Sequence, residues 1–191
     1  REALMSYLKA KKLTELLISK SMTIAVAESC TGGLLSSSLT SIPGASSYFN
    51  CGFITYSNES KINMLNVNPQ SIEHFGAVSE KVAYEMAMGA GQNSNSNLAI
   101  SVTGIAGPSG GTPEKPVGMV CFGFYVNGHV STTTQFFSGV RSEIVAESIA
   151  FARRALLRLW GTGRPLPHLK PPRRHGPPPP WHSAPRRKAR R

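Results

Sequence analysis

A serine stands between a predicted strand and a predicted helix, in the segment AESCTGG at 27–33. The small and β-branched run at 23–26 indicates a buried strand, and residues 34–39 are typical of a helix. This position places Ser29 where free backbone N–H groups converge and the positive end of the helix dipole points. The pattern favours a nucleophilic serine, a bound phosphate, or both. An ordinary helix cap is the alternative, with Thr31 the better capping residue.

A tyrosine and a lysine follow the next predicted strand, in the segment TYSNESK at 55–61. If the chain turns at residues 57–58, both Tyr56 and Lys61 face the edge of the sheet. A lysine that is partly removed from water loses its proton more readily and can serve as the base for a serine. A solvated lysine on a short helix is the alternative interpretation.

A glycine-rich segment, SVTGIAGPSGG at 101–111, follows a third predicted strand. Its backbone N–H groups are free to wrap an anion, and its glycines let a ligand approach the backbone closely. The segment matches neither the Walker loop nor the G-x-G-x-x-G fingerprint, and a flexible hairpin-like loop is the alternative. Arg141, at the start of the last predicted helix, offers a fork of donors to a phosphate, although an arginine there is more often solvated.

The acidic residues of the chain are ten glutamates, with no aspartate. This composition excludes an aspartyl-phosphate intermediate, an aspartic dyad and the usual aspartate-built Mg²⁺ or Ca²⁺ site. Only His74 and His129 precede residue 160, and neither has a metal-ligand neighbour at useful spacing, so we expect no metal. A Ser-His-Asp triad is impossible without aspartate, and a Ser-His-Glu triad is strained with two scattered histidines. A serine hydrolase of this composition must therefore use an amine or a phenol as its base, and Lys61 and Tyr56 are the nearest candidates.

The formal net charge of +11 arises mainly from residues 160–191. That segment holds nine of the 21 basic residues and no acid, which leaves 12 basic against 10 acidic residues elsewhere. It also holds nine of the 14 prolines, a composition typical of a disordered tail. We therefore expect one globular domain over residues 1–159 and a Pro/Arg-rich tail over 160–191. Nucleic acid is expected to bind, if at all, only through that tail.

The cysteines are three in number and widely spaced, at positions 30, 51 and 121. The sequence shows neither a signal peptide nor a run of about 18 apolar residues. We therefore expect reduced thiols, a cytoplasmic location and no membrane partner.

Helical and strand-like segments alternate along the chain, and Asn127-Gly128 is a strong signal for a hairpin turn. This arrangement predicts an α/β fold, a three-layer α/β/α domain with a mixed β-sheet. Residues 91–97 are expected to form a loop, and Ser79 is expected to cap the helix that follows it. The predicted helices span 2–20, 31–41, 58–65, 69–75 and 141–159, and the predicted strands span 23–27, 49–56, 98–102, 117–126 and 129–137.

Taken together, the motifs resemble the CinA C-terminal domain family, which includes stand-alone nicotinamide-mononucleotide deamidases of the PncC type. The resemblance covers roughly residues 3–159, including the helix that Arg141 opens. Its ordered motifs are AESCTGG at 27–33, G-x-x-x-Y-S-N-x-x-K at 52–61, GAVSEKVA at 76–83, SVTGIAGPSGG at 101–111 and KPVG at 115–118.

The resemblance implies hydrolysis of nicotinamide mononucleotide to nicotinate mononucleotide and ammonia, in pyridine nucleotide salvage and without a cofactor. By position, Ser29 looks like the nucleophile, Lys61 like its general base, and Tyr56 like an aid to proton transfer or positioning. Backbone N–H groups near Gly32-Gly33 are expected to stabilise the oxyanion. Family members commonly form homo-oligomers. The expected substrate-binding residues are Thr31, Gly32, Gly33, Thr103, Gly104, Gly107, Gly110 and Arg141.

A non-catalytic nucleotide-binding module, associated with competence or DNA damage, is the alternative function. Such a module would bind the mononucleotide and return it unchanged, so an assay for the product separates the two hypotheses.

Overall fold

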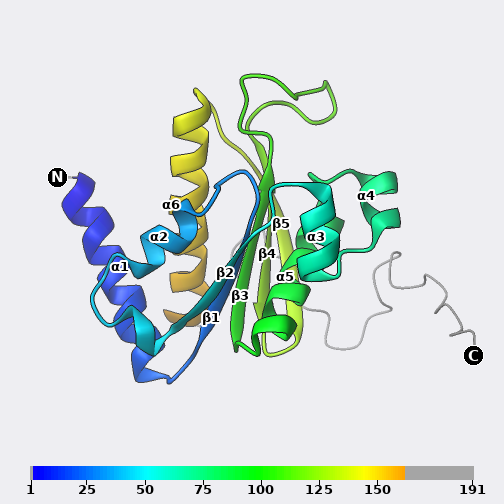
Figure 1. Ribbon diagram of the computed structural model, residues 1–191. Coiled ribbons are helices and arrows are strands. Elements are labelled where there is room, and N and C mark those ends of the chain that lie inside the picture. The colour runs from blue at the N-terminus through cyan, green and yellow to red at the C-terminus, as the bar shows by residue number, and fades with distance from the viewer. Residues whose placement is uncertain (1, 162–191) are drawn as a thin grey trace, which may run out of the picture.

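The computed structural model describes residues 2–161. Its five-stranded sheet contains three neighbouring parallel strands (Figure 1). Strand β1 (Ile24–Glu28) lies between β2 (Phe49–Ile54) and β3 (Leu98–Gly104) and is parallel to both. Strands β4 (Met119–Val126) and β5 (His129–Phe136) continue the sheet in antiparallel register. The sheet order is β2-β1-β3-β4-β5, which confirms the predicted mixed sheet.

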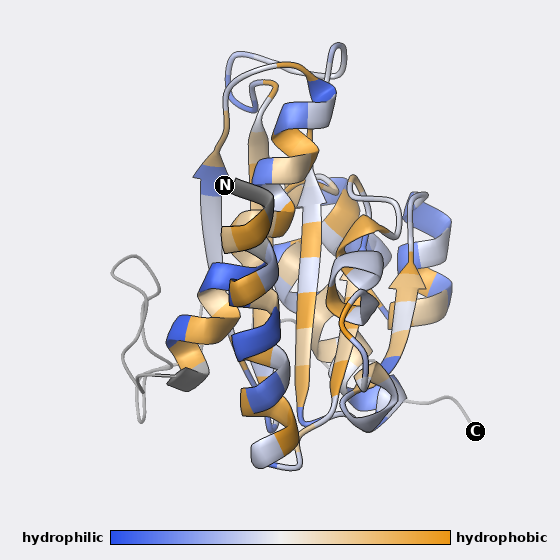
Figure 2. Cartoon of the chain, turned by 90° about the vertical axis from the view of Figure 1, so that its left-hand side faces the viewer, coloured by the Kyte–Doolittle hydropathy of each residue, from blue (hydrophilic) through white to orange (hydrophobic). Residues whose placement is uncertain are grey.

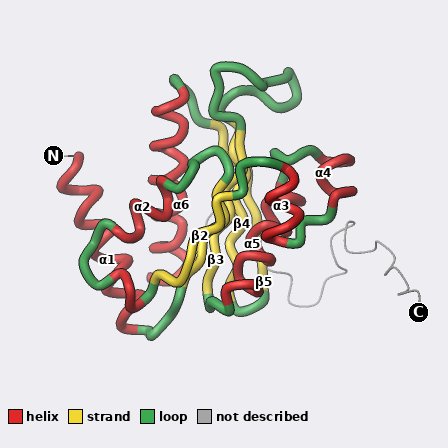
Figure 3. Tube along the Cα trace, viewed as in Figure 1, coloured by secondary structure: helices red, strands yellow, loops and turns green. Residues whose placement is uncertain are grey.

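Helices cover both faces of the sheet and so form the outer layers of the predicted three-layer domain (Figures 1 and 3). One layer contains α1 (Glu2–Ser19), α2 (Leu34–Thr40) and α6 (Arg141–Gly161). The other contains α3 (Asn58–Leu65), α4 (Pro69–Phe75) and α5 (Glu80–Ser94). A short 3₁₀ helix, η1 (Ala45–Ser47), precedes β2.

Strand β1 is buried on both faces, as expected for the central strand of a parallel sheet. Because successive side chains of a strand point to opposite faces, Ile24 and Val26 belong to one hydrophobic cluster, while Ala25 and Ala27 belong to the other. The helices in Figure 2 carry both orange and blue segments, as expected when one face of a helix meets the core. The core therefore fixes the strand that ends immediately before Ser29.

Several predicted boundaries differ from the structure. The loop predicted at 91–97 is shorter, at 95–97, because α5 continues to Ser94 and is capped by Asn95, whose φ of 52° is left-handed. The helix predicted at 31–41 begins only at Leu34, since Gly32 and Gly33 have positive φ angles of 55° and 98°. The strand expected at 49–56 ends at Ile54, and the strand expected at 98–102 extends to Gly104.

The hairpin and the Ser79 cap were predicted correctly. Asn127 and Gly128 both have positive φ angles, 45° and 92°, as a two-residue type I′ turn requires. The Ser79 side chain accepts a hydrogen bond from the Val82 N–H.

The Pro/Arg-rich segment from residue 162 onward lies outside the described residues, so the expected tail stays a prediction. Among residues 2–161, no helix is both long enough and apolar enough to span a membrane.

Candidate active site

The carboxyl ends of the three parallel strands meet at one edge of the sheet. Ser29 follows β1, Thr103 and Gly104 end β3, and Lys61 lies on the helix that follows β2. In α/β sheets, ligands bind in the crevice outside these strand ends. A cavity of about 190 Å³ lies there, lined by Ser29, Cys30, Tyr56, Asn58, Lys61, Ala77, Val78, Thr103, Gly104, Ala106 and Arg141.

The Lys61 amine contacts the Ser29 hydroxyl within this cavity. The Nζ atom lies 3.0 Å from Ser29 Oγ, and Lys61 and Ser29 are only 1% and 9% exposed. Within the described part of the chain, the ion pairs are Lys11–Glu15 and Lys81–Glu85, so no carboxylate pairs with Lys61. Burial lowers the pKa of Lys61 from 10.5 to about 8, partly opposed by the neighbouring Cys30. An uncharged amine is therefore accessible near neutral pH.

Three oxygen atoms lie within hydrogen-bonding distance of the Lys61 amine. Besides Ser29, Nζ contacts the carbonyl oxygens of Thr55 and Tyr56, at 2.8 and 3.3 Å. A neutral amine has two N–H donors and one lone pair, whereas an ammonium has three donors and no acceptor. As an ammonium, Nζ donates to all three oxygens; once the amine is neutral, donation to the two carbonyls leaves its lone pair to accept the Ser29 O–H. This arrangement is the one that a general base requires.

Helix α3 carries Lys61 to this position from a capped start. The Ser57 hydroxyl accepts a hydrogen bond from the Ser60 N–H at 3.0 Å, as a serine N-cap does. Thr55, just before this cap, donates its backbone N–H to the Glu28 carbonyl at 2.7 Å. Since the Thr55 carbonyl also accepts from Lys61, one residue links the base to the strand that holds the serine.

A buried carboxylate, Glu28, fixes the turn that carries Ser29. Its oxygens accept hydrogen bonds from the Thr31 hydroxyl (2.7 Å), the backbone N–H groups of Leu35 (2.8 Å) and Ser36 (3.0 Å), and the Ser36 hydroxyl (2.7 Å). The side chain is 0% exposed and therefore needs these partners. Glu28 thus caps α2, a task that the sequence interpretation gave to Thr31.

This cap changes the surroundings of the predicted oxyanion site. The N–H groups of Leu35 and Ser36 point at Glu28, and the Gly32 N–H donates to the Ser29 carbonyl at 3.1 Å. Thr31, Gly32 and Gly33 were expected to bind the substrate, but they do not line the cavity.

Tyr56 and Arg141 meet at the exposed side of the cavity. Arg141 donates through Nη2 to the Tyr56 hydroxyl (2.8 Å) and through Nη1 to the Gly107 carbonyl (2.7 Å). The Tyr56 side chain is 60% exposed. Gly107 thus contacts Arg141 without lining the cavity, and Gly110 is exposed in the same loop, also outside the lining.

The structure brings together six of the predicted site residues: Ser29, Tyr56, Lys61, Thr103, Gly104 and Arg141. It adds cavity residues to which the sequence interpretation gave no role: Asn58, Ala77, Val78 and Ala106. Asn58 lies inside the Y-S-N-x-x-K motif, and Ala77-Val78 lie inside GAVSEKVA, so their motifs were visible although their roles were not. Nothing in the sequence pattern indicated that the Glu28 carboxylate would cap α2.

Cys30 also lines the cavity, immediately after Ser29. Burial raises the pKa of its thiol to about 11, so the thiol stays protonated at neutral pH. A protonated thiol is a poor nucleophile, which leaves the Ser29 hydroxyl as the better candidate. Between residues 2 and 161, no cluster of three His, Cys or Glu side chains could hold a metal ion.

Comparison with known proteins places this arrangement in a family. The model of the CinA C-terminal domain matches residues 7–160. The chain belongs to the CinA C-terminal domain family. A relative in Alkaliphilus metalliredigens is 50% identical over 154 residues, covering 78% of this chain and 36% of its own length. A relative in Clostridioides difficile is 52% identical over 132 residues, which cover 69% of this chain and 32% of the relative.

Both of these relatives are provisionally named competence-damage inducible proteins. This chain therefore spans about a third of the length of the curated CinA-family relatives that it matches.

Solved structures of the CinA superfamily share the fold across nearly their whole length. A Klebsiella pneumoniae protein superposes with a TM-score of 0.79 at 31% identity, covering 82% of this chain and 98% of its own. The competence/damage inducible protein CihA from Agrobacterium tumefaciens superposes with a TM-score of 0.72 at 39% identity, and the match covers 82% of this chain and 96% of that protein. These structures confirm the α/β fold class and the family.

Proposed function

We propose that this CinA-family chain is a serine amidohydrolase that converts nicotinamide mononucleotide and water to nicotinate mononucleotide and ammonia. The observation that carries the proposal is the buried contact of 3.0 Å between Lys61 Nζ and Ser29 Oγ. A lysine buried in a core for a purely structural purpose is expected to pair with a carboxylate, because an unpaired buried charge destabilises the fold. Here the amine instead contacts a hydroxyl in the wall of a ligand-sized cavity.

Acylation begins with transfer of the Ser29 proton to the Lys61 amine. The Ser29 oxygen forms a bond to the carboxamide carbon of the substrate, and the carbonyl oxygen gains the negative charge. When this intermediate collapses, the C–N bond breaks, and the Lys61 ammonium returns its proton to the departing nitrogen. Ammonia leaves, and the acyl group remains on Ser29 as an ester.

Deacylation repeats the same proton transfers with water as the nucleophile. Lys61 takes a proton from water while the water oxygen bonds to the acyl carbon. The bond between that carbon and Ser29 Oγ then breaks, and Lys61 returns the proton to Oγ. The sum of the two steps is one amide and one water consumed, with one carboxylic acid and one ammonia formed.

The cavity wall offers groups of the right kind for a pyridine mononucleotide. Ala77, Val78 and Ala106 are apolar and suit a flat ring, while Arg141 and the loop from Gly104 suit a phosphate. We assign to Asn58 the role of an N–H donor to the carboxamide oxygen, because the N–H groups at the start of α2 bind Glu28. An amide donor of this kind is typically worth about 3–4 kcal/mol to an oxyanion.

A product assay with matched variants tests the proposal. The purified chain is incubated with nicotinamide mononucleotide, and nicotinate mononucleotide and ammonia are measured together. We expect equal amounts of both products, with turnover lowered by a factor of about 1,000 or more in Ser29→Ala and in Lys61→Met. Cys30→Ala should keep turning over. Circular dichroism of each variant shows whether the fold is retained.

If the wild-type chain binds the mononucleotide and returns it unchanged, the enzyme proposal is wrong. The alternative, a nucleotide-binding module, would then be favoured.

A further inference from the structure

One wall of the cavity is formed by residues 75–78, which are the last residue of α4 and three residues without regular structure before α5. Ala77 and Val78 line the cavity from this segment. Gly76 caps α4 with a φ of 77°, a conformation that L side chains rarely adopt. A segment of this kind is usually among the more mobile parts of a protein.

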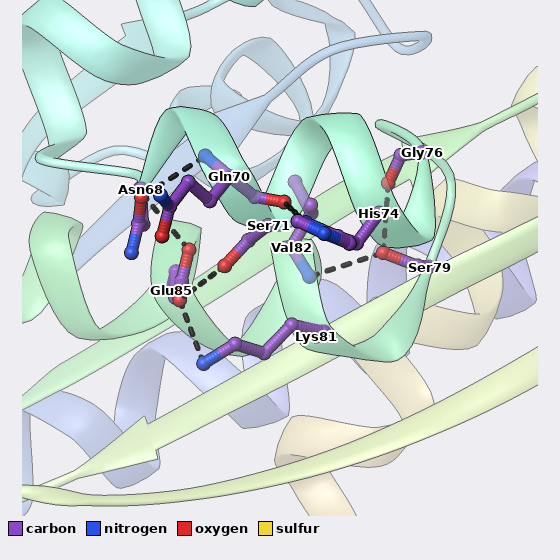
Figure 4. Close-up of polar contacts among 9 residues, drawn as sticks. All are labelled: Asn68, Gln70, Ser71, His74, Gly76, Ser79, Lys81, Val82 and Glu85. Carbon is purple, nitrogen blue, oxygen red and sulfur yellow. Dashed lines mark hydrogen bonds and ion pairs between the residues drawn. The ribbon is translucent and has the colours of Figure 1, made fainter. Parts of the chain in front are cut away.

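Side chains nevertheless hold every carbonyl oxygen of this segment. The Lys115 amine donates to the Phe75 carbonyl and, at 2.7 Å, to the Val78 carbonyl. The Ser79 hydroxyl donates to the Gly76 carbonyl at 2.8 Å, as Figure 4 shows. The Thr103 hydroxyl donates to the Ala77 carbonyl at 2.9 Å. The wall is thus fixed from three directions.

Lys115 is the donor that reaches this segment from farthest away in the sequence, from the loop that joins β3 to β4. Its ammonium binds two carbonyls rather than a carboxylate, since the ion pairs among residues 2–161 involve other lysines. Hydrogen bonds from a charged donor are about twice as strong as neutral ones. A Cβ atom on Gly76 would lie 2.8 Å from Lys115 Nζ, so a side chain at this position would push the lysine amine aside.

The two helices that flank residues 75–78 are joined by contacts that do not involve Lys115. Glu85 of α5 accepts from the Asn68 N–H (3.0 Å) and the Ser71 hydroxyl (2.9 Å) at the start of α4, and pairs with Lys81 at 2.7 Å (Figure 4). These contacts join α4 to α5. Removal of Lys115 should therefore loosen the wall locally without separating the two helices.

We propose that Lys115 is a positioning residue that holds Ala77 and Val78 where the flat ring of the substrate packs against them. The proposal rests on the proposed function for the identity of the substrate. Lys115 itself is outside the cavity lining, so it acts through the wall and not by contact with the reacting atoms. It should govern substrate affinity and leave the chemistry at Ser29 unchanged.

The test compares Lys115→Met with a matched control, Lys81→Met, which removes a lysine of similar burial that binds Glu85 instead of the wall. We expect KM for nicotinamide mononucleotide to rise about tenfold in Lys115→Met, with kcat within about twofold of wild type. Lys81→Met should keep the wild-type KM. Lys115→Arg retains the charge and the donors and should recover part of the affinity.

Amide hydrogen exchange tests the wall itself, independently of activity. Exchange of the Gly76 amide, whose N–H donates to the Ile72 carbonyl at 2.9 Å, should be about ten times faster in Lys115→Met than in wild type, with no change in the strands. Gly76→Ala should also raise KM, both because its methyl group meets the Lys115 amine and because L side chains rarely adopt the φ of 77° at this position. If Lys115→Met is poorly folded, Lys115→Arg carries the comparison.

A wild-type KM in Lys115→Met, or unchanged exchange of the Gly76 amide in that variant, would overturn the role of Lys115. Failure of the proposed function looks different, because it appears in the wild-type chain as an absence of product. The exchange measurement still decides the role of Lys115 in that case.

Discussion

The pH dependence of the reaction follows from the state of Lys61. With a pKa of about 8, about one Lys61 in ten is neutral at pH 7. At the ordinary pKa of 10.5, only about one in 3,000 would be neutral at that pH. Burial therefore increases the amount of the reactive form about 300-fold, equivalent to about 3 kcal/mol.

The rate of Ser29 modification should therefore rise with pH and then level off. We expect about a tenfold rise between pH 6 and 7 and almost no change between pH 9 and 10, because Lys61 is then already neutral. A fluorophosphonate that reacts with serine is the appropriate probe, since the phosphate of a mononucleotide titrates near pH 6 and would add its own effect. The second-order rate constant is measured by intact mass from pH 6 to 10, with Lys61→Met as the control.

A rate that does not change between pH 6 and 9 would refute the reasoning, and so would a midpoint near 10.5. The first result would mean that Lys61 is not the base. The second would mean that burial does not lower the pKa of Lys61.

Two further predictions concern stability. Glu28→Gln should lower the free energy of unfolding by about 3 kcal/mol, because the amide replaces one of the two acceptor oxygens with an NH2 donor, which then faces the N–H group of either Leu35 or Ser36; a thermal melt near the wild-type Tm would contradict this. Lys61→Met should stabilise the fold by about 1–3 kcal/mol at pH 7, because it removes a buried charge. The difference in stability between the variant and the wild type should shrink as pH rises from about 8 to 10.5, because in that range only the unfolded wild-type chain still binds the Lys61 proton. Urea denaturation of both proteins at pH 7 and at pH 10 measures the difference.

The sequence predicted the parts of the site that lie at the ends of apolar strands. Ser29 follows β1, Thr103 lies at the end of β3, and Lys61 lies on the helix after β2; the carboxyl ends of these parallel strands meet at one edge of the sheet. The hairpin at Asn127-Gly128 was predictable for a similar reason, because few residue pairs accept two positive φ angles.

Contacts that depend on the tertiary fold could not be read from local patterns. The AESCTGG motif indicated a helix start, but not that the Glu28 carboxylate would fold over and bind the N–H groups of Leu35 and Ser36. The link between Lys115 and residues 75–78 joins positions about 40 apart in the sequence. Only the packing of α4, α5 and the β3–β4 loop around the cavity brings them together.

Interception by hydroxylamine tests most directly whether the acyl group of the carboxamide is transferred to Ser29. An ester on Ser29 should divide between water and hydroxylamine, so the wild-type chain is predicted to convert part of the mononucleotide to the hydroxamate while releasing ammonia at the same total rate. Ser29→Ala should form neither product. Hydroxamate formation by Ser29→Ala, or ammonia release by wild type with no hydroxamate at saturating hydroxylamine, would contradict a covalent role for this serine.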